Sequence, residues 1–109
     1  MVSEAVRERF LRDPLQVRLG GLAADLARIA SFGENPANHH AVASLLEESK
    51  YFAEWMAPDA PVETQAVLAE LQVRLALWER RWRQGIEVPN LQQEAEQRST
   101  ALLSLAGLV

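Results

Sequence analysis

The side chains best suited to chemistry in this sequence are two adjacent histidines, a run of arginines among tryptophans, and scattered glutamates. His39 and His40 are the only histidines. Adjacent residues on a helix point about 100° apart, so the two rings cannot share a metal ion as i, i+4 ligands do. His40, Glu47 and Glu54 share one stripe, but seven residues span about 10.5 Å along a helix, too far for one ion. The sequence predicts neither a metal site nor a bound cofactor.

Groups for acid–base or covalent catalysis are also lacking. Glu47 and Glu48 are adjacent and diverge on a helix, and no acidic residue stands alone in an apolar seam. The absence of cysteine removes thiol nucleophiles, thiolate metal sites and disulfides. We therefore expect no catalytic activity.

A cluster of cations and aromatic rings lies near the middle of the second half of the chain, at Trp78, Arg80, Arg81, Trp82 and Arg83. Arginines beside aromatic rings can clasp phosphates and stack on bases, which suggests contact with nucleic acid. The net charge of −4 opposes a general phosphate-binding surface. Cations in a last helical turn also complement the helix dipole, so the structural interpretation of the cluster is preferred and nucleic acid is not the expected partner.

The densest polar stretch around a turn is a candidate recognition loop, containing Asn35, Asn38, His39 and His40. Exposed loops often carry recognition, although the same residue types also begin helices. Trp55, Trp78 and Trp82 suggest a further role, binding of a small apolar or aromatic ligand between helices. In an antiparallel helix pair Trp55 and Trp82 lie far apart, so core packing is the preferred explanation for the three rings.

Composition and charge order place the chain among folded, non-membrane proteins. Its 109 residues are 49% hydrophobic and 24% charged, and residues 1–109 are expected to form one helical-bundle domain. The first ten residues carry charges where a signal peptide needs an apolar stretch, and no apolar run approaches the roughly 18 residues of a membrane span. We expect a cytoplasmic protein with no membrane partner.

Helix is favoured throughout, because Ala and Leu are abundant and the β-branched residues Ile and Thr occur twice each. Proline and glycine divide the chain into a short helix and four longer ones. Asp13 with Gln16 resembles a capping box, Asn35 and Asn90 resemble helix starts, and Gly33 and Gly85 resemble helix ends. The predicted helices are 3–12, 15–32, 36–57, 61–84 and 91–106.

Each long helix carries apolar residues at spacings of three and four, as an amphipathic helix requires. Short connections force neighbouring helices to run in opposite directions. We therefore predict an all-α protein, an antiparallel bundle of four main helices with a short N-terminal helix packed across one end.

The helix predicted over 61–84 is unusual because it has two apolar faces. One is a leucine and tryptophan seam, and the opposite one consists of Val62, Ala66, Ala69, Val73, Ala76 and Leu77. Charged and amide side chains lie on the flanks between the faces: Glu63, Glu70, Arg74 and Arg81 on one, Gln65, Gln72, Glu79 and Arg83 on the other. The second face predicts contact with another subunit, unless the chain's own N-terminal segment or C-terminal tail covers it.

A weaker second face occurs on the helix predicted over 15–32, where Gly20, Ala23, Ala24 and Ala27 lie away from the leucines. Small residues at such spacings allow close approach of two backbones. The sequence as a whole favours a protein that acts through protein–protein contact, as a homodimer with an unknown further protein partner.

Overall fold

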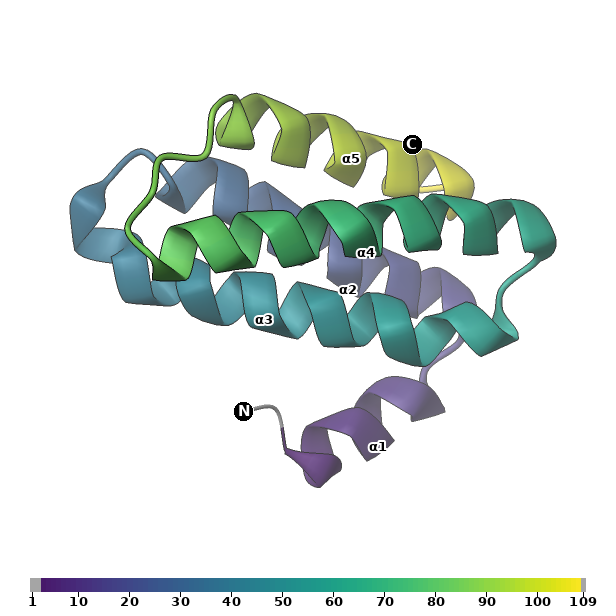
Figure 1. The fold of residues 1–109 in the computed structure, drawn as a ribbon. Helices are drawn as coiled ribbons and strands as arrows, with labels where there is room; N and C mark the ends of the chain where they lie inside the picture. The colour runs from purple at the N-terminus through teal and green to yellow at the C-terminus, as the bar shows by residue number, and fades with distance from the viewer. Residues whose placement is uncertain (1–2, 109) are drawn as a thin grey trace.

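The chain folds into an all-α antiparallel bundle of four main helices with a short N-terminal helix, as the sequence predicts (Figure 1). The computed structural model describes residues 3–108, and none of these forms a strand. The helices are α1 (Glu4–Arg12), α2 (Leu15–Phe32), α3 (His39–Met56), α4 (Val62–Arg83) and α5 (Leu91–Leu105). Two short 3₁₀ turns, η1 (Pro36–Asn38) and η2 (Ala57–Asp59), stand before and after α3.

Helix α2 is the central packing element of the bundle, because α3 lies against one side of it and α5 against another. Helix α4 packs mainly on α3, while α5 approaches it less closely. Figure 1 shows α3 and α5 on the two sides of α4. This arrangement leaves one side of α4 with no neighbouring helix.

Helix α1 lies against α3, and not across one end of the bundle as the sequence analysis expects (Figure 1). The Phe10 ring stacks on the Phe52 ring with centroids 4.1 Å apart, and the Trp55 ring lies 6.0 Å from Phe10. Phe52 and Trp55 are on the outer side of α3, so they attract the apolar side of α1 there. Burial of these aromatic rings sets the position of α1.

The core consists of one apolar face from each long helix, with Leu22, Leu26, Leu46, Leu71 and Leu75 fully or almost fully buried. On α5 the predicted inward residues Ala95, Leu102 and Ala106 are buried, together with Leu91 and Ser99. Of the seam predicted on α4, Leu68 and Trp78 are buried and Trp82 is half-buried.

Some helix ends differ from the sequence expectation. Helix α2 begins after Pro14 with no side-chain cap, so the prediction of Asp13 as its N-cap is wrong. Asp13 instead ends α1, where its N–H donates to the Phe10 carbonyl (3.2 Å). The Gln16 amide donates to the Ala106 carbonyl (2.7 Å), so a tertiary hydrogen bond replaces the expected capping box.

Helix α3 begins at His39 because the turn that starts at Pro36 is a 3₁₀ turn. Gly33 ends α2 as expected, with its N–H donating to the Ile29 carbonyl (2.9 Å). Asn90 stands before α5 in the left-handed region (φ 60°) and makes no side-chain cap.

Candidate functional site

The second apolar face of α4 is open to solvent in the folded chain. We call the six residues Val62, Ala66, Ala69, Val73, Ala76 and Leu77 the α4 strip. The exposed fraction is 76% for Val62, 61% for Val73 and 47% for Leu77, and the three alanines are exposed as well. Nothing within residues 3–108 covers the strip, so for these residues the alternative that the chain covers it is wrong.

The opposite face of α4 explains why the strip is left over. Leu68, Leu71, Leu75 and Trp78 are buried and face α3 and the core, which satisfies the one apolar face that a bundle helix needs. An apolar stripe that runs about 22 Å along the other side adds nothing to the core. Large exposed apolar surfaces on soluble proteins mark interaction sites more often than chance.

Ion pairs border the strip on both flanks. On one flank, the Arg74 guanidinium contacts the Glu94 carboxylate of α5 (3.1 Å), and Arg98 of α5 contacts Glu70 (3.0 Å). On the other flank, Lys50 of α3 contacts Glu79 (2.7 Å). These pairs tie α4 to its two neighbours and leave the apolar strip between them.

A hollow of about 250 Å³ opens beside Leu77 at the C-terminal end of the strip. Two arginines line it, Arg74 and Arg81, together with Leu77, Trp78, Val88, Pro89 and Glu94. Arg81 donates at 3.5 Å to the Glu87 carbonyl, and no carboxylate within residues 3–108 forms an ion pair with it. The hollow therefore offers an acidic side chain a cation at the edge of the strip.

The candidate recognition loop is mostly occupied by local hydrogen bonds. The Asn35 side chain accepts from the Ala37 N–H (3.0 Å), and the Asn38 amide donates to the Phe32 carbonyl (3.4 Å). The His39 ring stacks on the Trp82 ring, with centroids 5.0 Å apart, while His40 is exposed. Of these four residues, His39 alone is joined to another candidate cluster.

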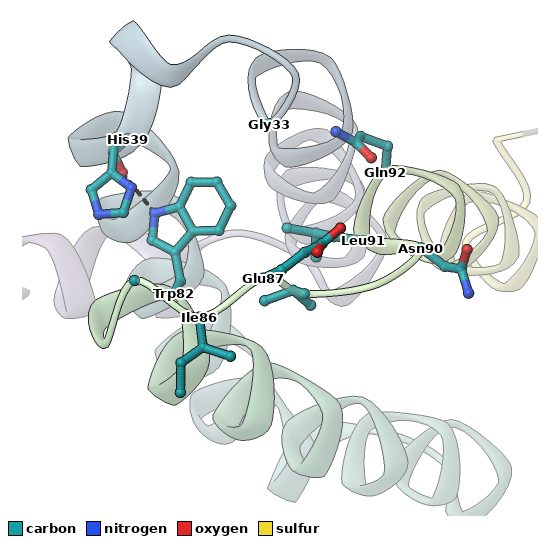
Figure 2. A pocket seen from close by; sticks show the side chains of 10 residues that line it. Gly33, His39, Trp82, Ile86, Glu87, Asn90, Leu91 and Gln92 are labelled. Carbon is teal, nitrogen blue, oxygen red and sulfur yellow. Dashed lines mark hydrogen bonds between the residues drawn. The ribbon is translucent and has the colours of Figure 1, made fainter.

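His39 and Trp82 border the larger hollow shown in Figure 2, which has a volume of about 460 Å³. The Trp82 indole N–H donates to the His39 carbonyl (2.9 Å), drawn as the dashed line. Glu87, Leu91 and Gln92 line the hollow from the loop before α5 and from the first turn of that helix. One face of the indole is thus already stacked on an imidazole, and its N–H is already satisfied.

The three tryptophans lie in different places and line no common cavity. Trp55 packs with Phe10, Phe52 and Tyr51 near α1, Trp78 is buried in the core, and Trp82 stacks on His39. The arrangement leaves only Trp82 on the wall of a large hollow.

The basic and aromatic cluster does not form a continuous cationic surface. Arg83 contacts Glu47 at 2.9 Å and Glu79 at 3.6 Å, so its charge is balanced by two carboxylates. Trp78 is only 4% exposed, so its ring cannot stack on a base. Arg80 and Arg81 remain exposed at the end of the α4 strip.

A buried acidic residue is the main feature that the sequence analysis missed. Asp25 of α2 is only 2% exposed, which contradicts the expectation that no acidic residue stands in an apolar seam. The signal was present, because Asp25 is three residues after Leu22 and four before Ile29, on the same helix face.

Burial, followed by a hydrogen bond to Glu48 and the negative charge of Glu48, raises the pKa of Asp25 to about 8, against the opposing effect of Arg28. The Asp25 Oδ1 accepts from Arg28 (3.1 Å), but its Oδ2 meets no N–H donor. The raised pKa favours the protonated form of Asp25 at neutral pH, which lowers the cost of burying this carboxyl group. Because Asp25 is almost fully buried, it cannot touch a substrate and serves the α2–α3 contact.

Within residues 3–108, no three His, Asp or Glu side chains come together as a metal ion would require. The helices described here are too short or too polar to cross a bilayer. In comparisons with known proteins, no protein-family model matches this chain, and no curated protein or solved structure matches it either.

Proposed function

We propose that this protein acts through protein–protein contact, as a homodimer that buries the α4 strip. The observation that supports this role best is the exposure of Val62, Val73 and Leu77 on a helix whose other face is fully used in the core. The proposal includes no catalytic step.

The size of the strip agrees with a modest but specific association. Burial of about 500 Å² of apolar surface per subunit contributes, at about 25 cal/mol per Å², about 12 kcal/mol before the costs of association. Those costs are about 4 to 15 kcal/mol, which is of the same order as the gain, so we expect a weak dimer whose population depends on concentration. The three alanines in the strip allow two helices to approach closely.

A second copy is a suitable occupant because the same strip then serves both partners. In a twofold dimer each subunit supplies the same apolar surface to the other. A further protein partner would dock on the dimer or compete for the same strip.

Val73→Glu tests the role directly. Val73 is exposed near the middle of the strip, so a charge there leaves the folded subunit intact and is buried only in the dimer. We expect the wild-type protein to scatter light as a dimer at tens of micromolar and the variant to weaken the dimer at least about 30-fold.

Val17→Glu is the matched control, because Val17 is an exposed valine (52%) on α2, away from the strip. The Val17→Glu variant should show the same dimer mass in light scattering as the wild-type protein. A wild-type protein that remains a monomer at several hundred micromolar would rule out the homodimer.

The two alternative functions have less support. A ligand between the tryptophans has no shared cavity to occupy, and the hollow beside Trp82 is wide and open to the loop before α5. Contact with nucleic acid would rely mainly on Arg80 and Arg81, since Arg83 is paired and Trp78 is buried. Neither surface matches the extent of the α4 strip.

A further inference from the structure

The charges that border the α4 strip have a symmetry of their own. On the α5 side of α4, acidic residues lie in the N-terminal half of the helix and basic residues in the C-terminal half: Glu63, Glu70, Arg74 and Arg81. Glu63 and Arg81 are each nine residues from position 72, and Glu70 and Arg74 are each two residues from it. Opposite charges therefore stand at equal distances from one point on the helix.

Within one chain, the two outer residues of this symmetric set, Glu63 and Arg81, are too far apart to interact. Glu63 and Arg81 are 18 residues apart on α4, which corresponds to about 27 Å along the axis. Neither of them forms an ion pair with the residues that the structure describes. Glu70 and Arg74, in contrast, are already paired with Arg98 and Glu94 of α5.

A twofold axis perpendicular to two facing helices reverses their direction and brings the same flank of each helix together. With the axis near position 72, Glu63 of each copy then lies at the level of Arg81 of the other. A parallel pair, related by a twofold axis that runs along the helices, would instead bring opposite flanks together, so Glu63 and Arg81 of the two copies would not meet.

The central part of the apolar strip agrees with this register. With the axis at residue 71, Ala66 faces Ala76 and Ala69 faces Val73 of the other copy, whereas at the ends Val62 faces Arg80 and Leu77 faces Gln65. This axis is one residue from the centre of the charged flank and offsets Glu63 from Arg81 by about 3 Å along the helix, which long Glu and Arg side chains accommodate. A valine packed on an alanine at each central position fits a close helix crossing.

The hollow at the end of the strip can receive the Glu63 side chain of a second copy. Arg74 and Arg81 line it beside Leu77, at the level that Glu63 of a second copy would reach. A carboxylate placed there gains Arg81, which forms no ion pair with a carboxylate of residues 3–108.

We propose that two copies pair antiparallel through their α4 helices, with Glu63 of each copy docked in the hollow of the other, against Arg81. This arrangement rests on the homodimer proposed above and adds its direction, its register and the residues that select the partner. The partner recognised in this way is a second copy of this chain.

Charge reversal tests the pairing. Glu63→Arg and Arg81→Glu each place like charges together twice per dimer, so each should raise the dimer Kd about tenfold or more in sedimentation or light scattering. The double variant Glu63→Arg/Arg81→Glu restores both pairs and should return the Kd to within about threefold of wild type. Both residues are exposed, so the variants should fold as the wild type does. Their circular dichroism spectra should therefore match the wild-type spectrum, which provides the control for folding.

A distance measurement tests the direction independently. Because the chain has no cysteine, Gln84→Cys introduces a single spin-label site at the exposed C-terminal end of α4. The antiparallel pair places the two labels about 35 to 40 Å apart along the helices, whereas a parallel pair places them within about 20 Å.

The outcomes separate the two proposals. A monomeric wild-type protein overturns the homodimer and the pairing together. A dimer that Val73→Glu dissociates, but that ignores both charge reversals or shows the short label distance, keeps the homodimer and overturns the antiparallel pairing.

Discussion

Helices α2 and α4 present the same sequence feature and reach opposite outcomes. Both carry alanines opposite a leucine seam. On α2 the small face is used within the chain, because α5 lies on it: the Ser99 hydroxyl donates to the Ala23 carbonyl (2.7 Å), and a Cβ at Gly20 would stand 3.2 Å from Leu108. On α4 the small face remains exposed.

The difference follows from the path of the loop that joins α4 to α5. Gly85 (φ 71°) ends α4 and Asn90 (φ 60°) precedes α5, and both adopt left-handed backbone. The loop directs α5 back onto α2, so α5 covers Ala23 of α2, while Ala27 of α2 and the three alanines of the α4 strip stay exposed. A second apolar face in the sequence therefore does not show whether the same chain covers it, because the path of the chain decides that.

Each of the two helices also buries one acidic side chain. We expect that replacing each acid by its neutral amide changes the free energy of unfolding in opposite directions. Asp25 on α2 has a raised pKa, whereas Glu79 on α4 accepts from Lys50 at 2.7 Å. Asp25→Asn should raise the free energy of unfolding by about 2 to 4 kcal/mol at pH 7, since the amide mimics the neutral carboxyl. Glu79→Gln should lower it by about 1 kcal/mol, because Lys50 loses its charged partner.

The pH dependence of wild-type stability sharpens this expectation. The folded pKa of about 8 for Asp25 lies above the unfolded value of 3.8, so the stability contribution is fully present below pH 3.8. As the pH rises from 3.8 to about 8, the unfolded chain has lost the proton that the folded chain retains, and stability falls. Urea titrations between pH 5 and pH 9 should show this fall in wild type and not in Asp25→Asn; parallel curves would refute the buried neutral acid.

Replacing one alanine by leucine on each of the two faces should affect folding stability differently. Ala23→Leu places three extra carbons where α5 packs on α2, which should cost about 1 to 3 kcal/mol of folding free energy. Ala69→Leu on α4 points into solvent and should change monomer stability by less than about 0.5 kcal/mol. Denaturation below the dimer Kd measures both; equal losses would mean that the α4 face is covered within the chain.

The smallest expected effect concerns how α5 is held on its two sides. Against α2 it uses buried packing, and against α4 it uses two ion pairs, Arg74 with Glu94 and the more exposed Arg98 with Glu70. Glu70→Gln should therefore cost less than about 1 kcal/mol, and the loss should vanish at high salt. A salt-independent loss of several kcal/mol in thermal unfolding would show that the ion pair, and not the packing on α2, positions α5.

Much of the fold was predictable because local rules decide it. Leu68, Leu71, Leu75 and Trp78 follow the helical period and are buried as expected. The place of α1 was not predictable, since the exposed aromatic side of α3 that attracts Phe10 is evident only once α3 is packed. Asp25 was missed although its spacing showed it, because a carboxyl is not expected in a seam unless a proton or a cation neutralises it.

For the candidate site, the residues of the α4 strip came from the helical period alone, whereas their exposure depended on where α5 and α1 lie. The Arg74 and Arg81 hollow required the loop at Val88 and Pro89 to pass beside α4. By itself, the sequence determined the helices, their apolar faces and the charge order along α4, because these depend on neighbours within a few turns. Only the tertiary structure decided which of two similar faces is buried, since that depends on contacts between segments more than 70 residues apart, such as Ser99 with Ala23.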